Sequence, residues 1–232
     1  MGRIRVYVGL GANIGYAADT LAAAVHALAA LPRVRLVGVS RLYATVPVGV
    51  TDQPEFRNAV VALDVLSGPD PEIGALALLI ALKGLERAFG RRAGQRWGPR
   101  ALDLDLLVFG RHAIHVERPP EARSRGRART DDPARADVAA GAAPQWLTVP
   151  HASARERLFV LAPLADLAPG LRPPGWGETV ATARRRAELS EGPAAARPIA
   201  EWDRATGAWE PQDSAAVAPD GSPVVSSDER TT

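Results

Sequence analysis

The segment from Leu102 to Leu106 alternates between leucine and aspartate, which places two acids, Asp103 and Asp105, two positions apart. In an extended strand, side chains at this spacing point to the same face, so we expect the two carboxylates to lie side by side. Adjacent carboxylates repel each other unless a cation lies between them. Hard oxygen ligands suit Mg²⁺, which completes its shell with water and substrate phosphates. The pattern therefore favours a strand face that binds one or two divalent ions.

Several arginines and a Trp-Gly-Pro turn come just before this strand. Guanidinium groups bind phosphate oxygens in a bidentate manner, and proline makes the turn rigid. The arginines are Arg91, Arg92, Arg96 and Arg100, and the turn is Trp97-Gly98-Pro99. The combination predicts a site for a metal ion and a polyphosphate. The alternative, in which these charges form an ordinary solvated surface, stays open at this point.

Composition limits the classes of protein that this chain can be. It has 232 residues, 47% of them hydrophobic, which is enough for a full core, and we expect one domain with appendages. Because it has no cysteine, disulfides and thiolate metal sites are excluded, and a cytoplasmic location is expected. We expect no membrane span and no signal peptide, since long apolar runs are missing. The net charge of +2 does not predict a nucleic-acid partner.

Hydrophobic periodicity predicts an α+β fold. We expect strands at residues 4–10, 34–43 and 56–65, followed by the strand that carries the two acids. We expect one helix that is capped by Asp19 or Thr20 and ended by Pro32, and further helices at residues 71–89 and 156–167. This order matches a ferredoxin-like antiparallel sheet with helices packed on one face. The other face of the sheet would then be free to bind ligands.

Two segments have few of the large apolar residues that a core requires. Residues 118–145 are rich in Arg, Ala, Pro, Gly and Asp, and we expect a flexible insert there. The main domain is predicted to span residues 1–169. Residues 170–232 would form a C-terminal extension that is largely disordered after about residue 212. Three tryptophans, Trp176, Trp202 and Trp209, lie in the earlier part of the extension, and we expect this part to pack across the sheet.

Two further polar residues stand at unusual positions. Asn58 lies between Phe56 and Val60 on one face of a predicted strand, and a buried amide needs hydrogen-bond partners. Asn58 would therefore bond a loop backbone or the edge of a heterocyclic ligand. Glu86 lies near the end of a predicted helix, where a carboxylate opposes the helix dipole. A surface pair with Arg87 or Arg91 would be a sufficient reason for it.

Taken together, these motifs resemble those of the 6-hydroxymethyl-7,8-dihydropterin pyrophosphokinase family of folate biosynthesis. The similarity covers about residues 6–167 and leaves out the insert. The matching segments are residues 9–15, 43–58, 90–92, 96–105 and 147–151. The resemblance implies the ferredoxin-like fold and transfer of a pyrophosphoryl group from ATP to the hydroxymethyl oxygen of the pterin, with release of AMP.

The resemblance also implies a role for each residue that matches a family motif. Asp103 and Asp105 would bind two Mg²⁺ ions that bridge the triphosphate of ATP, the co-substrate. The residues implied in catalysis are Arg91, Arg92 and Arg100. Those implied in pterin binding are Thr45, Val48, Phe56, Asn58, Trp97 and Phe159. Those implied in ATP binding are Glu86, Arg91, Trp97, Arg100, Leu106, Thr148, His151 and Arg157.

The implied partners are the two small-molecule substrates, and we expect a monomer without nucleic-acid or membrane partners. The chain departs from the family pattern at several positions, and one of them is Lys83, which stands where a polar amide is usual. The other departures are Val46, Phe56, Trp146 and Ala152.

Two other classes of protein fit parts of the pattern. A nucleotidyl- or glycosyltransferase can also carry an Asp-x-Asp strand. A ferredoxin-like sheet can bind RNA or regulatory ligands without catalysis. RNA-binding sheets of this kind stack bases on aromatic residues, and this chain is only 5% aromatic, with acids on the relevant face.

Overall fold

The computed structural model describes residues 2–47, 52–66, 68–90, 99–117 and 145–211. Five residues singled out above, Val48, Arg91, Arg92, Arg96 and Trp97, lie outside the described residues. The same is true of residues 118–144 of the predicted insert and of the chain after residue 211. No helix in the described ranges combines the length and the apolar character needed to cross a membrane.

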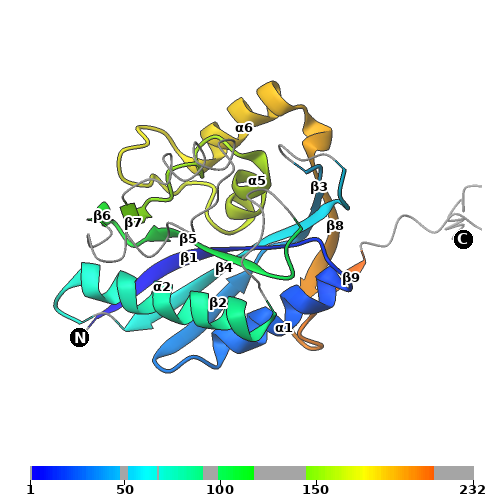
Figure 1. Cartoon of the computed structure of the whole chain (residues 1–232). Helices are drawn as coiled ribbons and strands as arrows, with labels where there is room; N and C mark the ends of the chain where they lie inside the picture. Colours follow the sequence, from blue (N-terminus) through cyan, green and yellow to red (C-terminus); the bar gives the residue numbers. More distant parts are fainter. Residues whose placement is uncertain (1, 48–51, 67, 91–98, 118–144, 212–232) are drawn as a thin grey trace, which may run out of the picture.

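An antiparallel sheet forms the centre of the molecule, with strand order β5-β1-β4-β3-β8-β9 and with β2 also paired to β4 (Figure 1). Its strands are β1 (Arg3–Ala12), β2 (Val34–Val39), β3 (Leu42–Thr45), β4 (Phe56–Leu66), β5 (Asp103–Phe109), β8 (Ala196–Asp203) and β9 (Ala208–Pro211). A separate two-stranded sheet pairs β6 (Ile114–Glu117) with β7 (Gln145–Val149). The predicted strand at residues 34–43 is therefore two strands, both of which pair with β4.

Helices α1 (Ala17–Ala29) and α2 (Pro71–Ala88) cover one face of the sheet, as predicted. Leu21 and Leu28 of α1 and Leu82 of α2 are fully buried against Leu63 of β4. Asp70 caps α2, because its Oδ1 accepts a hydrogen bond from the Glu72 backbone at 2.8 Å, and proline occupies the first helical position.

The start of α1 differs from the prediction. Tyr16 is the residue before the helix, and Asp19 lies inside the first turn instead of capping it. Gly15, with φ 61°, turns the chain so that its carbonyl accepts a hydrogen bond from Ala17 N at 3.0 Å. The helix therefore begins at Ala17, before Asp19 and Thr20, the two residues that the sequence pattern favoured as its cap.

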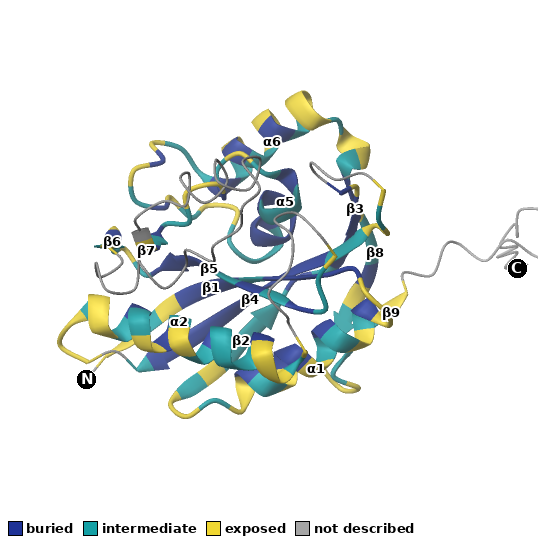
Figure 2. Cartoon of the chain, in the orientation of Figure 1, coloured by how far each residue is buried: buried dark blue, intermediate teal, exposed yellow. Residues whose placement is uncertain are grey.

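The opposite face of the sheet is also partly covered, by α5 (Leu158–Leu167) and α6 (Val180–Glu191). Leu158 and Leu161 pack against Tyr43 and Val60 of the sheet, and Figure 2 shows the buried sides of α5 and α6 turned inward. The α+β class and the antiparallel sheet with α1 and α2 packed on one face are confirmed, and α5 and α6 lie on the other face. The reason is that both faces of β4 are apolar, so both need cover.

Beyond residue 169 the chain adds to both the sheet and the core. Strand β8 continues the sheet by pairing with β3. Trp176 is 6% exposed and belongs to the apolar cluster that α5 and α6 form with the sheet. Trp202 and Trp209 meet edge to face at 4.7 Å between ring centroids, and Trp209 Nε1 donates a hydrogen bond to Ser40 O. His26 of α1 lies 2.8 Å from Gly207 O, so the extension up to β9 is anchored on both the sheet and α1.

An ion-pair cluster joins β1, β2 and β4. The Asp64 carboxylate accepts hydrogen bonds from Arg5 Nε at 2.7 Å and from Arg35 Nη2 at 2.5 Å. These two hydrogen bonds lower the pKa of Asp64 to about 2, against the smaller opposing effect of burial. Because the pKa is lower in the folded chain, the cluster stabilises the fold fully above about pH 4, and this contribution is lost as the pH falls through about 2.

We predict that Asp64→Asn lowers the free energy of unfolding at pH 7 by about 1 kcal/mol. The figure is modest because the Arg5 and Arg35 side chains are 43% and 63% exposed, so solvent screens the pairs. Urea denaturation at pH 7, 4 and 2 measures the effect, and the difference from the wild-type protein should be much smaller at pH 2 than at pH 7. A difference that stays constant down to pH 2 would contradict this account.

Candidate active site

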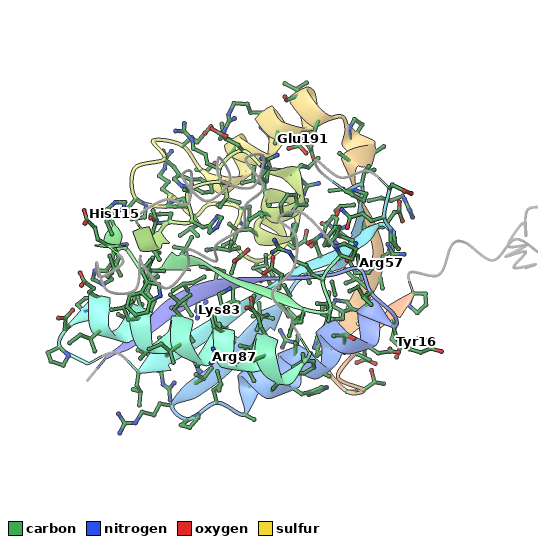
Figure 3. All side chains as sticks on the ribbon, in the orientation of Figure 1. Tyr16, Arg57, Lys83, Arg87, His115 and Glu191 are labelled. Carbon is green, nitrogen blue, oxygen red and sulfur yellow. The ribbon has the colours of Figure 1, made fainter. Side chains whose placement is uncertain are left out.

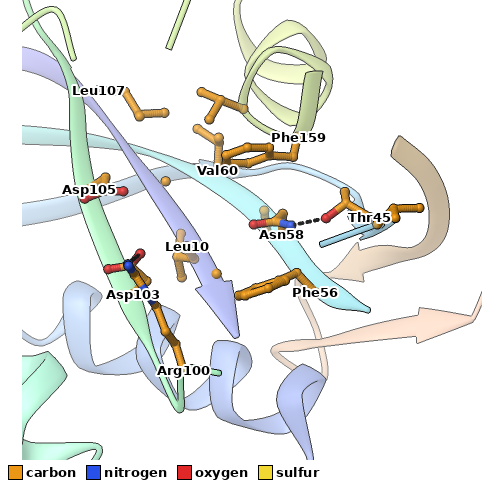
Figure 4. A pocket seen from close by; sticks show the side chains of 15 residues that line it. Leu10, Thr45, Phe56, Asn58, Val60, Arg100, Asp103, Asp105, Leu107 and Phe159 are labelled. Carbon is orange, nitrogen blue, oxygen red and sulfur yellow. Dashed lines mark hydrogen bonds and ion pairs between the residues drawn. The ribbon is translucent and has the colours of Figure 1, made fainter. Parts of the chain in front are cut away.

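A pocket opens on the sheet face that carries α5, and its walls come from β1, β3, β4, β5 and α5 (Figure 4). Gly9 and Gly11 of β1 form part of its floor, where the absence of side chains exposes the backbone. At Gly11 a Cβ atom would lie 3.0 Å from Asn58 Oδ1, so glycine leaves room for that amide. The pocket therefore lies on the face of the sheet that the sequence pattern assigned to ligands.

One end of the pocket is an apolar slot with a polar edge. Phe56, Asn58 and Val60 project into it from alternate positions of β4, and Phe159 projects from α5 (Figure 4). The Asn58 and Thr45 side chains are buried, and Asn58 Nδ2 donates a hydrogen bond of 2.7 Å to Thr45 Oγ1. The amide thus bonds a side chain of β3 instead of a loop backbone.

The other end of the pocket is acidic. Asp103 and Asp105 both line it from β5, whereas Leu102, Leu104 and Leu106 are buried in the core beneath the opposite face. The predicted same-face arrangement of the two acids is confirmed. Arg100 Nη1 donates a hydrogen bond to Asp103 Oδ2, so an arginine of the predicted phosphate clamp lies at the acid pair. The backbone N–H of Arg100 donates to Asn13 Oδ1 at 2.8 Å, which fixes the turn before the strand.

The electrostatics of this end favour a bound cation. Reduced access to bulk water in the recess and repulsion from the Asp103 carboxylate raise the pKa of Asp105, while His151, Lys83 and Arg100 oppose that rise. The Asp105 side chain nevertheless keeps 45% of its accessible surface, so a ligand can reach it. A divalent ion would relieve the repulsion between the two carboxylates.

The donor set fits Mg²⁺ better than a metal that needs an all-protein cage. In the described ranges, no group of three or more His, Cys, Asp and Glu side chains is placed to hold an ion. Mg²⁺ is commonly held by one or two carboxylates, with water and substrate phosphates as its other ligands. Asp103 and Asp105 supply that number of carboxylates on one open surface.

Lys83, the single lysine of the chain, lies on α2 (Figure 3), and its side chain approaches Asp105. Its Nζ atom lies 4.0 Å from Asp105 Oδ1, 2.7 Å from Glu86 Oε1 and 3.0 Å from Leu104 O. The sequence pattern marked Lys83 as a departure from the family. Its proximity to Asp105 was not predicted, because it depends on how α2 packs against β5.

Glu86 is 2% exposed, so it is not the surface residue that a pair with Arg87 would require, and Arg91 lies outside the described residues. Its Oε1 accepts hydrogen bonds from Leu104 N at 2.8 Å and from Lys83 Nζ. Leu104 lies between the two acids, so Glu86 ties α2 to the part of β5 that carries them. Its role in the described geometry is to position that strand.

The other residues predicted to bind ATP are more scattered. His151 N donates a hydrogen bond to Leu107 O at 2.9 Å, and His151 Nδ1 is buried without a hydrogen-bond partner in the described structure. Thr148 lies on β7 opposite His115, and Arg157 immediately precedes α5. Leu106 faces the core beneath α2, and it is Leu107 that lines the pocket. The structure therefore does not place Leu106, Thr148 or Arg157 in this pocket.

Comparison with known proteins assigns the chain to a family. A sequence model of the 7,8-dihydro-6-hydroxymethylpterin-pyrophosphokinase (HPPK) family matches residues 7–169. The chain belongs to this family. The 2-amino-4-hydroxy-6-hydroxymethyldihydropteridine pyrophosphokinase of Pseudomonas aeruginosa is 41% identical over 170 residues, which are 73% of this chain and 84% of the relative. The enzyme of the same name from Methylorubrum extorquens is 39% identical over 167 residues, 72% and 84% of the two chains.

Solved structures agree at the level of the fold. A structure titled as HPPK-DHPS in complex with substrates superimposes with a TM-score of 0.64 at 13% identity and covers 91% of this chain. A Plasmodium falciparum HPPK-DHPS structure gives a TM-score of 0.60 at 15% identity and covers 90%. This chain spans about half the length of each of those proteins. At such identities the similarity concerns the fold alone.

We predict that Glu86→Ala lowers the free energy of unfolding by about 2–3 kcal/mol, because Leu104 N–H then loses its acceptor in the core. Glu86→Gln keeps a side-chain oxygen at the same distance along the chain and should lose less than half as much. Urea denaturation of the two variants and the wild-type protein tests this. Equal losses for both would show that the Glu86 oxygen does not act as the acceptor for β5.

Proposed function

We propose that the pocket binds 6-hydroxymethyl-7,8-dihydropterin in its apolar slot and the phosphates of ATP at its acidic end. Members of the HPPK family transfer pyrophosphate from ATP to the hydroxymethyl group of this pterin, in folate biosynthesis. The observation that supports this proposal is that the apolar slot and the acidic end belong to one cavity. A slot for a flat heterocycle and a pair of carboxylates for a metal–phosphate complex open toward each other.

In the slot, the pterin ring would lie between the Phe56 and Phe159 rings. Aromatic side chains bind flat heterocycles through stacking, and a few buried polar groups determine which heterocycle is accepted. Asn58 and Thr45 supply those groups, since they are buried and already oriented by their mutual hydrogen bond. Val48 and Trp97 remain proposed contacts from the adjoining segments.

At the acidic end, Asp103 and Asp105 would hold two Mg²⁺ ions, which neutralise phosphate charge and orient the triphosphate. Arg100 is adjacent to both acids and would exchange its contact with Asp103 for a phosphate oxygen. Arg91 and Arg92 would complete the clamp. The arginine side chains would keep the reacting groups aligned, and their positive charges would offset the negative charge that develops on the phosphate oxygens.

The reaction joins the pterin hydroxymethyl oxygen to the β-phosphorus of ATP and breaks the bond between that phosphorus and the oxygen bridging to the α-phosphate. AMP leaves with the electron pair of the broken bond, and the hydroxyl proton is released. His151, which interacts electrostatically with Asp105, remains a proposed contact of the nucleotide. Leu106, Thr148 and Arg157 remain sequence-based candidates for that role, and Glu86 acts through β5. We further propose that the protein is a monomer and works in the cytoplasm.

We predict that Asp105→Ala lowers turnover at least ~100-fold, because the variant loses half of the carboxylate pair that holds the metal. The assay measures AMP formation from ATP and Mg²⁺, and AMP should appear only when the hydroxymethyl dihydropterin is added. Asp19→Ala, at an exposed position on α1, is the matched control and should keep wild-type activity. Near-normal turnover by Asp105→Ala, with an unchanged circular dichroism spectrum, would refute the metal assignment.

We predict that Thr45→Val raises KM for the pterin about tenfold and changes KM for ATP less than twofold. Valine has the same shape but removes the acceptor that orients Asn58, and an unsatisfied buried amide recognises a heterocycle poorly. Steady-state kinetics with each substrate varied in turn separate the two constants. Parallel changes in both constants would show that Thr45 does not act at the pterin end.

A further inference from the structure

We infer that the C-terminal segment, residues 170–211, is a positioning element of the pterin slot. The inference rests on the proposed function, since it concerns the same pocket. The family match ends at residue 169, yet the later segment contacts both walls of the slot. It does so through β8, next to β3, and through the end of α6, next to the start of α5.

The first contact is a strand pairing. Strand β3 has four residues and lies between β4 and β8, with Thr45 opposite Phe56 on one side and Ala196 on the other. A strand of this length at the edge of a sheet is held by few hydrogen bonds, so pairing on both sides restricts it strongly. Thr45 is its last residue. The position of the Thr45 hydroxyl, and through it of Asn58, therefore depends in part on β8.

The second contact is a helix cap supplied by another helix. The residue before α5 is Arg157, whose side chain makes no capping hydrogen bond. Glu191 is the last residue of α6 (Figure 3). It fills this role because its Oε1 accepts a hydrogen bond of 2.9 Å from Leu158 N. A carboxylate at a helix N-terminus satisfies a free N–H and interacts favourably with the helix dipole. The next residue, Phe159, supplies the aromatic ring that α5 contributes to the slot.

A short corner joins the two contacts. Only residues 192–195 separate Glu191 from Ala196, the first residue of β8. Gly192 begins the corner with φ 85° and ψ 148°, a backbone conformation that side chains disfavour. The short corner therefore links the position of α5, through α6, to the position of β3, through β8. It thereby affects the separation of the two pocket walls that carry Phe159 and Thr45.

The acidic end is remote from this corner. In the sheet, strands β1, β4 and β3 lie between β5, which carries the acids, and β8. A disturbance at Glu191 should therefore weaken binding of the pterin more than binding of ATP, for which Arg157 at the start of α5 is the one nearby candidate contact. A segment that merely stabilises the fold would affect both substrates in the same way.

The test is Glu191→Ala in the full chain. We expect the dissociation constant for the pterin, measured by calorimetry in the presence of a non-hydrolysable ATP analogue, to rise about fivefold, the effect expected for loss of one helix cap. KM for the pterin should rise by a similar factor, while KM for ATP stays within about 1.5-fold. Glu191→Gln keeps an acceptor oxygen without the charge, and it should restore most of the pterin affinity.

Glu188→Ala is the matched control. Glu188 lies one turn earlier on α6, and its carboxylate accepts a hydrogen bond from Arg184 Nε at 2.7 Å, on the same helix. This variant should bind both substrates like the wild-type protein. The inference is overturned if Glu191→Ala matches Glu188→Ala, or if it weakens ATP and pterin binding equally. If the wild-type protein itself binds no pterin, the proposed function fails, which is a separate result.

Discussion

The candidate site depends on one constraint, which is that two negatively charged side chains lie side by side on an open strand face. Asp103 and Asp105 repel each other, and the repulsion contributes to a raised pKa of Asp105. The protein places cations around the pair, with Arg100 bonded to Asp103 and Lys83 near Asp105. It also holds the strand from behind, through the hydrogen bond from Leu104 N to Glu86. This arrangement maintains a concentrated negative charge that a hard divalent ion can neutralise.

The position of the acids relative to the aromatic slot follows from the sheet. Strands β5 and β4 flank β1, and glycines of β1 lie opposite both Asp103 and Asp105. Since glycine presents only backbone at this point, the space above β1 stays open between the acids on one side and Asn58 on the other. In the proposed function, a substrate that spans the two ends would lie across β1, with its flat part toward β4 and its reacting group toward β5.

Several features of the site could be predicted because they depend on neighbours in the chain. The common face of Asp103 and Asp105 follows from strand alternation, which is a local property. The projection of Phe56, Asn58 and Val60 to one side has the same origin. Helix α2 was also predicted, from the periodicity of its apolar residues. The features that could not be predicted lie where two elements meet, as for Glu86, whose carboxylate is buried against β5, and for α5, which packs on the face of the sheet that carries the pocket.

The sequence by itself determined the family, the antiparallel sheet and the identity of the acids, since these are written in short motifs and in residue periodicity. Tertiary structure alone decided that Lys83 reaches Asp105, that Glu191 caps α5 and that the chain beyond residue 169 completes the sheet. The physical reason is that each of these contacts joins residues distant in sequence. Their meeting depends on how whole faces of helices and strands bury their apolar surface, and no local pattern encodes that choice.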